Sequence, residues 1–358
     1  MKTYRFTLVL LFLFVSCRLT FAQPLPANEM RAHYINVGQA NATLLEFSCG
    51  AILIDAGSQD ATSGQDLIHY LQRFFTRRTD LNKTLALVIV THDHKDHNVS
   101  LKAIAAQFTI KNYIDNGVPA GSGRAAQNWM DSYAPAHAIA YANFSYDQAA
   151  ALTGHPGLHN AVIDPVNCSS TDPDIRILSG RFAALPHGWT QAESDKNGNL
   201  HSLVIKVTFG HSSFLFTGDL ELKAMQKVLD LYRGTGLLDC DVWEVSHHGS
   251  YNGSTSAWLR EVTPKYAIIS CGKWDSGINT PAGSFNTFNF GHPRIVTLDT
   301  LAMFIPGNRP ALDSIVAFSG IRDKHRNYKV TRNIYCNAWD GTIVLSAFQD
   351  GTYKFITP

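Results

Sequence analysis

Three histidines and two aspartates lie in the six-residue segment HDHKDH at 92–97. On an extended loop His92 and His94 can point in one direction, while the adjacent Asp96 and His97 turn to another. Imidazole nitrogens and carboxylate oxygens are ligands of zinc and related divalent metals. The spacing therefore predicts two groups of ligands that hold two neighbouring metal ions.

The elements around this motif must hold it rigidly. Residues 85–90 (LALVIV) are continuously apolar, which is typical of a strand covered on both faces, and this strand would deliver the motif at its C-terminal end. Asp55, Asp219 and the pair His247-His248 also follow strand-like apolar runs. Since all of them end strands, we expect these side chains to converge.

Strand-like and helical patterns alternate along much of the chain. Residues 60–78 have apolar positions at helical spacing, which predicts an amphipathic helix. Within this helix, we interpret Arg73, Arg77 and Arg78 as part of a solvated face rather than as a basic patch that binds nucleic acid. Strands are predicted from short apolar or alternating runs at 32–37, 42–47, 51–55, 85–90, 202–208, 213–217, 266–270, 342–348 and 352–356. The last two would form a hairpin around Asp350-Gly351.

Three segments resemble the motifs of the metallo-β-lactamase superfamily in order and spacing: LIDAG at 53–57, THDHKDH at 91–97 and FTGD at 216–219. More narrowly, INVGQ at 35–39, SLV at 202–204, HHGS at 247–250 and GHP at 291–293 resemble the hydrolase domain of ComEC-type DNA-uptake competence channels. The resemblance covers about residues 32 to 300. It implies an α/β fold, the four-layer αββα sandwich of that superfamily.

The resemblance also implies a ligand set. His92 and His94 would bind the first metal, Asp96 and His97 the second, and Asp219 would bridge the two. The expected cofactors are two divalent ions, with zinc favoured and manganese as the alternative.

The paired histidines and a nearby aspartate complete the implied site. One of His247 and His248 would join the second metal, and we favour His248, which leaves His247 to face the substrate. Asp55 would orient a ligand histidine or the motif loop through a hydrogen bond. His292 is a further candidate, either as a catalytic group or as a residue that only begins a helix before Pro293.

The first metal site departs from the family pattern. The family places a histidine in a Gly-His-Thr-like turn before the strand at 202–208, where this chain has GNLH at 198–201. We expect His201 to be the donor, with Asn199 as the alternative. An asparagine donor would make the site weaker or selective for manganese.

Two metals about 3.5 to 4 Å apart lower the pKa of a bridging water towards about 7 and stabilise charge on the attacking and leaving oxygens. The expected reaction is therefore hydrolysis, with Asp96, His247 and His292 as the candidate catalytic residues. His247, His292 or Ser250 would stabilise developing negative charge.

The expected substrate is a phosphodiester or another small ester-like compound. A phosphodiester substrate would make the chain a nuclease or phosphodiesterase. One alternative is a lactonase or β-lactamase-type hydrolase of a cyclic ester or amide; the missing Gly-His-Thr turn and the HHGS motif count against it. The other is a metal-bound binding protein without turnover, against which the nearly complete ligand set counts.

Residues 1–22 have the form of an export signal. Lys2 and Arg5 precede an apolar run at 6–15, and small residues follow it. We expect cleavage before Gln23 and hence a periplasmic or extracellular protein, with lipoprotein anchoring at Cys17 as the less favoured alternative. Residues 23–358 would form one hydrolase domain with no transmembrane segment and a C-terminal β-hairpin extension at about 305–358.

Charge and cysteine content limit the kinds of substrate, metal site and disulfide that the chain can have. Removal of residues 1–22 takes away three cations and changes the formal net charge from +1 to −2. Nucleic acid then remains a substrate only if few phosphates are contacted. The remaining five cysteines form no C-x-x-C pair, which excludes a zinc ribbon. An oxidising compartment would permit one or two disulfides of undetermined pairing.

Overall fold

The computed structural model describes residues 23–118 and 121–356. The predicted export signal, with Cys17, lies outside these residues. In the described ranges, no helix combines the length and the apolar character needed to cross a membrane.

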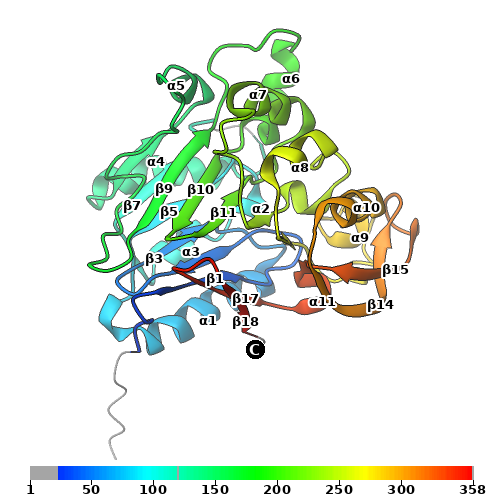
Figure 1. The fold of residues 1–358 in the computed structure, drawn as a ribbon, viewed down its shortest axis with the longest axis horizontal. Coiled ribbons are helices and arrows are strands. Elements are labelled where there is room, and N and C mark those ends of the chain that lie inside the picture. The colour runs from blue at the N-terminus through cyan, green and yellow to red at the C-terminus, as the bar shows by residue number, and fades with distance from the viewer. Residues whose placement is uncertain (1–22, 119–120, 357–358) are drawn as a thin grey trace, which may run out of the picture.

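Two mixed β-sheets form the centre of the molecule (Figure 1). The first has, in spatial order, β18 (Tyr353–Ile356), β17 (Ile343–Phe348), β1 (Glu29–Tyr34), β2 (Thr43–Glu46), β3 (Ala51–Ile54), β5 (Leu87–Ile89), β7 (Asn112–Asp115) and β8 (Ala140–Asn143). The second has β16 (Ile334–Cys336), β13 (Tyr266–Ile269), β12 (Val242–Glu244), β11 (Ser212–Phe216), β10 (Val204–Phe209) and β9 (Pro173–Ser179).

Alternating side chains of the strands build separate apolar layers. Leu45 and Ile52 belong to the core between the sheets, together with residues of the second sheet such as Val207. Their neighbours Leu44 and Leu53 belong to the core on the opposite face of the first sheet. Each sheet is thus apolar on both faces and needs helices on its outer side.

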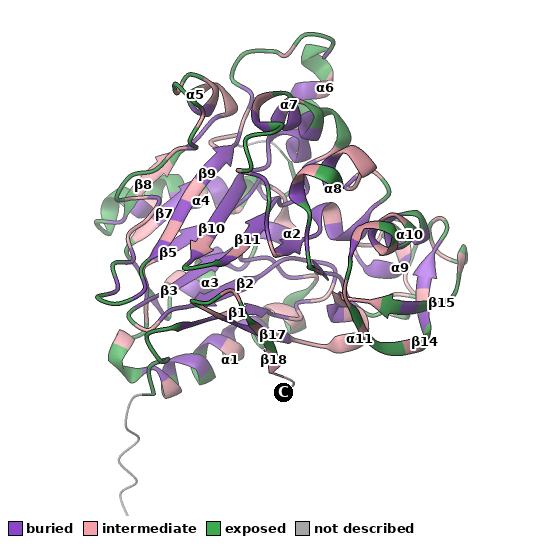
Figure 2. Cartoon of the chain, in the orientation of Figure 1, coloured by how far each residue is buried: buried purple, intermediate pink, exposed green. Residues whose placement is uncertain are grey.

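Helices cover both outer faces. The first sheet is covered by α1 (Ala61–Arg77), α3 (Leu101–Ala105) and α4 (Arg124–Ala136). The second is covered by α7 (Leu222–Tyr232), α8 (Ser256–Val262) and α10 (Ile295–Phe304). In Figure 1, α1 lies on one side of the sheets and α7 and α8 on the other, and Figure 2 shows the strands between them largely buried. The predicted four-layer αββα sandwich is confirmed.

The remaining elements are short. They are β4 (Thr84–Leu85), β6 (Thr109–Ile110), α2 (Lys95–Asn98), α5 (Tyr146–Ala150), α6 (Gln191–Lys196), α9 (Thr287–Phe290), α11 (Asn337–Asp340) and the 3-10 helices η1 (Thr79–Leu81), η2 (Gly198–His201) and η3 (Ser246–Gly249). The apolar run at 85–90 is not one strand, because β4 pairs with β6 outside the main sheet while β5 pairs with β3 and β7.

The end of α1 differs from the solvated face that the arginines predicted. Arg77 places Nη1 and Nη2 each 2.8 Å from the carboxylate of Glu46, and Arg78 Nη1 is 2.9 Å from it. Burial alone would raise the pKa of Glu46, but hydrogen bonds from His33 and Arg77 outweigh it and lower the pKa to about 2. Arg78 is itself fully buried, so these cations serve the fold.

The C-terminal segment takes part in both sheets. The predicted hairpin forms as β17 and β18, and β17 pairs antiparallel with β1 along its whole length. Its strand β16 pairs parallel with β13 in the second sheet. Before β16 in the chain, β14 (Asn308–Phe318) and β15 (His325–Arg332) make a separate two-stranded sheet, seen in orange at the side of the molecule in Figure 1. A disulfide joins Cys49 to Cys168.

Candidate metal centre

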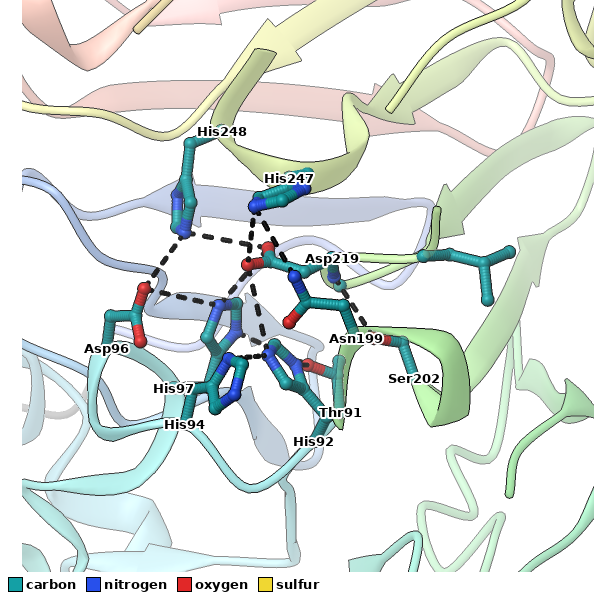
Figure 3. Close-up of polar contacts among 12 residues, drawn as sticks. Thr91, His92, His94, Asp96, His97, Asn199, Ser202, Asp219, His247 and His248 are labelled. Atoms are coloured by element: carbon teal, nitrogen blue, oxygen red, sulfur yellow. Dashed lines mark hydrogen bonds and ion pairs between the residues drawn. The ribbon is translucent and has the colours of Figure 1, made fainter. Parts of the chain in front are cut away.

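The predicted ligands other than His201 meet at one place, where strands of both sheets end (Figure 3). The first two histidines of the motif follow β5, and the rest of the motif lies on α2. Asp219 follows β11, and the paired histidines lie in η3 after β12. The side chains that line up here are His92, His94, Asp96, His97, Asp219, His247 and His248.

The donor group predicted for the second metal consists of Asp96, His97, Asp219 and His248. Each offers an atom within 4.8 Å of the others. His248 Nε2 lies 3.3 Å from Asp96 Oδ2 and 3.5 Å from Asp219 Oδ1. His97 Nε2 lies 3.3 Å from the same Asp219 oxygen.

The donor group predicted for the first metal consists of His92, His94 and Asp219, again with donor atoms within 4.8 Å of one another. His92 Nε2 lies 3.0 Å from His94 Nδ1 and 3.8 Å from Asp219 Oδ2. Asp219 therefore belongs to both groups and turns a different oxygen to each. This is the arrangement required of a carboxylate that bridges two ions.

In the two donor groups, His97 Nε2 and Asp219 Oδ1 are buried and 3.3 Å apart but not aligned for a hydrogen bond, and among the described residues neither has another hydrogen-bond partner. Buried polar atoms are nearly always paired, and these two face each other across a set of nitrogen and oxygen donors. The residues thus fit divalent metal ions of the zinc or manganese type.

Asp55 fixes the ring of His97. Its Oδ2 lies 2.7 Å from His97 Nδ1 and accepts a hydrogen bond from Thr91 Oγ1 at 2.9 Å, while its Oδ1 accepts from the Thr91 backbone N–H at 2.7 Å. An Nδ1–H that donates to this carboxylate leaves the Nε2 lone pair of His97 free to bind a metal. Asp55 holds this position with a backbone φ of 59°, in the left-handed region.

The paired histidines differ in their environment. His248 is buried, and its Nδ1 lies 2.7 Å from the carbonyl oxygen of Ser270, so that Nδ1 donates and Nε2 is left as an acceptor. His247 is partly exposed, and its Nε2 lies 3.8 Å from Asp219 Oδ2. This geometry favours His248 as the ligand and leaves His247 at the edge of the cavity.

The histidine pKa values differ between the two groups of donors. Burial would raise the pKa of Asp219, yet the neighbouring imidazoles of His248 and His97 hold it well below its ordinary value. Burial lowers the pKa of both His92 and His94. Burial alone would lower the pKa of His97 and His248 as well, but the Asp219 carboxylate outweighs it and raises both, that of His248 to about 9. Metal binding at these two nitrogens must therefore displace a proton.

A cavity of about 620 Å³ opens onto the cluster. The candidate catalytic residues Asp96, His247 and His292 all line it, together with Gln39, Lys95, Asn199, Phe285 and Phe290. Ser250 is buried, and its backbone carbonyl accepts a hydrogen bond from Thr297. Sequence reasoning missed Gln39 and Lys95 as lining residues, although both lie inside the recognised motifs at 35–39 and 91–97.

His201 does not join the cluster, contrary to our expectation. Its Nδ1 accepts from the backbone N–H of Phe182 at 3.1 Å, and its Nε2 lies 3.1 Å from the carbonyl oxygen of Ser194. Both ring nitrogens are thus engaged away from the cavity. Asn199, the alternative, lines the cavity, and its buried Oδ1 has no hydrogen-bond partner among the described residues (Figure 3).

The sequence matches a family model and is similar to several known proteins. The family model of the metallo-beta-lactamase superfamily matches residues 35–273. Protein YcaI of Escherichia coli (strain K12) is 24% identical over 264 residues, which is 73% of this chain and 27% of YcaI. Recombination protein 2 of Haemophilus influenzae is 28% identical over 244 residues, 67% of this chain and 24% of that protein. Competence protein ComA of Neisseria gonorrhoeae is 37% identical over 78 residues, 22% of this chain and 11% of that protein.

The chain spans about a quarter of the length of the first two of these relatives.

Proposed function

Because the chain belongs to the metallo-beta-lactamase superfamily, we propose that this metallohydrolase acts on phosphodiesters, with nucleic acid among its substrates. The observation that carries the proposal is the position of Asp219, whose two oxygens face separate groups of histidines. Such a centre suits an in-line displacement in which both the attacking and the leaving oxygen need stabilisation.

The chain offers a donor set for each of two ions. His92, His94 and Asp219, with Asn199 in place of His201, would hold the first. Asp96, His97, Asp219 and His248 would hold the second. Two bound divalent ions would supply a nucleophilic hydroxide near neutral pH and act as Lewis acids on a phosphoryl oxygen.

Other residues of the cavity would handle the substrate. His247 and His292 place imidazole rings at its wall, and Lys95, whose ammonium lies 4.4 Å from the centre of the Phe285 ring, lines the same cavity. Hydrogen bonds and positive charge from these groups would favour a transition state in which negative charge builds up on phosphoryl oxygens. Asp96, next to the paired histidines, would orient the attacking water.

Names of the relatives support a nucleic-acid substrate: they include a recombination protein and a competence protein. The formal charge of −2 beyond residue 22 argues against a large phosphate footprint. Binding to DNA should therefore weaken only slightly as salt increases, because few counterions are released.

Export is the second part of the proposal. The Cys49–Cys168 disulfide is of a kind that persists in oxidising compartments, and it agrees with a leader at residues 1–22. Protein recovered from the periplasm or the medium should have an intact mass that begins at Gln23. A mass that retains residues 1–22, or a lipid attached at Cys17, would contradict this route.

One preparation of known metal content tests the activity. Bis-p-nitrophenyl phosphate, single- and double-stranded DNA, a lactone and nitrocefin should be compared on it, before and after a chelator. We expect metal-dependent cleavage of the phosphodiesters. Turnover of the lactone or nitrocefin without any phosphodiester would move the assignment to a cyclic ester or amide hydrolase, and binding without turnover would refute an enzymatic role.

A further inference from the structure

Gln39 contacts His292 at the cavity wall, and Thr287 contacts Gln39. Gln39 Nε2 lies 2.8 Å from His292 Nδ1, and Thr287 Oγ1 lies 3.2 Å from Gln39 Oε1. All three side chains are at least nine-tenths buried: Gln39 is 1% exposed, Thr287 0% and His292 4%. Among the described residues, His292 Nε2 has no hydrogen-bond partner, and His292 lines the cavity.

The orientation of the Gln39 amide decides what His292 can do. If Nε2 of Gln39 faces His292, the amide donates to Nδ1, and the imidazole proton must lie on Nε2. If the amide is turned over, its oxygen accepts from an Nδ1–H, and the Nε2 of His292 becomes an acceptor. The two orientations therefore give the cavity a hydrogen-bond donor or a base.

The hydroxyl of Thr287 favours the first orientation. In it, Thr287 donates to Gln39 Oε1, Gln39 donates to His292 Nδ1, and every proton on these contacts has an acceptor. In the second orientation the Thr287 hydroxyl accepts from the amide, and its own proton has no acceptor among the described residues. A buried donor without a partner costs about 1 to 3 kcal/mol.

We propose that Gln39, held by Thr287, fixes His292 in the tautomer that carries its proton on Nε2, so that His292 donates a hydrogen bond to a substrate oxygen. Gln39 is a positioning residue in this arrangement, and His292 is the group that touches the substrate. The identity of that oxygen as a phosphoryl oxygen rests on the proposed function.

The electrostatic surroundings agree with this assignment. His292 is 4% exposed and its Nδ1 already faces Gln39, so a neutral ring with a single proton avoids an unpaired buried charge. The ring stacks near His248, with centroids 6.0 Å apart and planes at 20°. Its donor therefore lies beside the metal ligands, where charge would develop on the substrate.

Nitrogen-15 NMR of the full chain labelled in its histidine rings tests the tautomer directly, because protonated and unprotonated ring nitrogens have widely separated shifts. His292→Gln identifies the signals by their loss. We expect the proton on Nε2 in both the metal-free and the zinc-loaded protein. A proton on Nδ1, or on both nitrogens, would overturn the proposal.

Gln39→Glu tests the positioning role. A carboxylate still accepts from Thr287 but can only accept from His292, so the proton should move to Nδ1. Thr287→Val, which replaces the hydroxyl with a methyl group, should add a second population with the proton on Nδ1. It serves as the test if Gln39→Glu does not fold. Gln127→Leu is the matched control, since Gln127 is a buried amide, 1% exposed, bonded to Asp115. An unchanged tautomer in both test variants would refute the role of Gln39.

Kinetics separate this proposal from the proposed function. If phosphodiesters are the substrate, Gln39→Glu should lower kcat for bis-p-nitrophenyl phosphate about 10²-fold, as the loss of one preorganised donor does, with KM much less affected. If the wild-type protein cleaves no phosphodiester, the NMR result still decides the tautomer. A switched tautomer with unchanged kcat would show that His292 does not donate to the reacting group.

Discussion

Replacing Asp55 with asparagine tests how the ring of His97 is held for metal binding. The Asp55 carboxylate accepts from the backbone and hydroxyl of Thr91 and from His97 Nδ1. Asparagine has nearly the same shape but only one acceptor oxygen. If that oxygen keeps the Thr91 backbone N–H, the amide nitrogen faces His97 Nδ1, and the ring must move its proton to Nε2 to accept from it.

A His97 ring protonated on Nε2 cannot bind a metal through that atom. Metal binding must then break the new hydrogen bond and restore the other tautomer. Loss of such a partner commonly costs about 10- to 100-fold in metal affinity or activity, which corresponds to about 1.4 to 2.7 kcal/mol. The loss should fall on the ion held by His97, while the ion held by His92 and His94 is retained more tightly.

Competition of the protein with a chromogenic zinc chelator measures this difference. Asp115→Asn is the matched control: Asp115 is also a fully buried carboxylate, which accepts from Gly117 N–H at 2.8 Å and from Tyr141 at 3.2 Å but contacts no ligand histidine. Urea denaturation of the metal-free proteins reports any general loss of stability. Wild-type zinc affinity in Asp55→Asn would refute the reasoning.

Three further predictions concern other parts of the chain. Asp219→Asn should lower both the bound metal, measured by elemental analysis, and the turnover of a phosphodiester; full activity with two metals per chain would contradict the bridging role. Asn199→Ala should lower the metal content. His201→Ala should retain both ions but lose about 1 to 3 kcal/mol of unfolding free energy in urea, because buried groups lose their hydrogen-bond partner. The reverse pattern would restore His201 as the ligand. Because the pKa of Glu46 is lowered to about 2, its contribution of about 3 kcal/mol to stability is complete above the unfolded pKa near 4.3 and is lost as the pH falls towards 2. The difference in unfolding free energy between wild type and Glu46→Gln should therefore shrink between pH 6 and pH 3, and a constant difference would contradict the assigned pKa.

The centre could be predicted from the sequence where the information is local. In the segment at 92–97, spacing alone separates one pair of donors from the other, and the apolar run before it identifies a buried strand end. Asp219 could be predicted for the same reason, since it follows the strand-like run that becomes β11. Strand ends meet at one edge of a sheet, so convergence needed no knowledge of the loops.

The choice between Asn199 and His201 depends on contacts that are remote in sequence. Both residues lie in η2, and in a 3-10 helix side chains two positions apart point in different directions. His201 is drawn away by Phe182 and Ser194, whose positions depend on how the loops before β10 fold. The histidine is the stronger metal ligand by type, so chemistry without tertiary structure favoured a residue whose ring lies away from the donor groups.

The C-terminal segment also supports the site in a way that its hairpin pattern did not predict. With β17 paired along the whole of β1, the end of the chain adds an inner strand to the sheet from which the turn at 35–39 emerges. The same turn is tied down on both sides, because Asn36 N–H donates to Thr342 Oγ1 at 3.0 Å and Asn337 Nδ2 donates to the Tyr34 carbonyl at 3.0 Å. Gln39 lies in this turn, 253 residues before His292. The position of the amide that contacts His292 therefore depends on β17 and the residues just before it, which makes this segment a structural part of the catalytic domain.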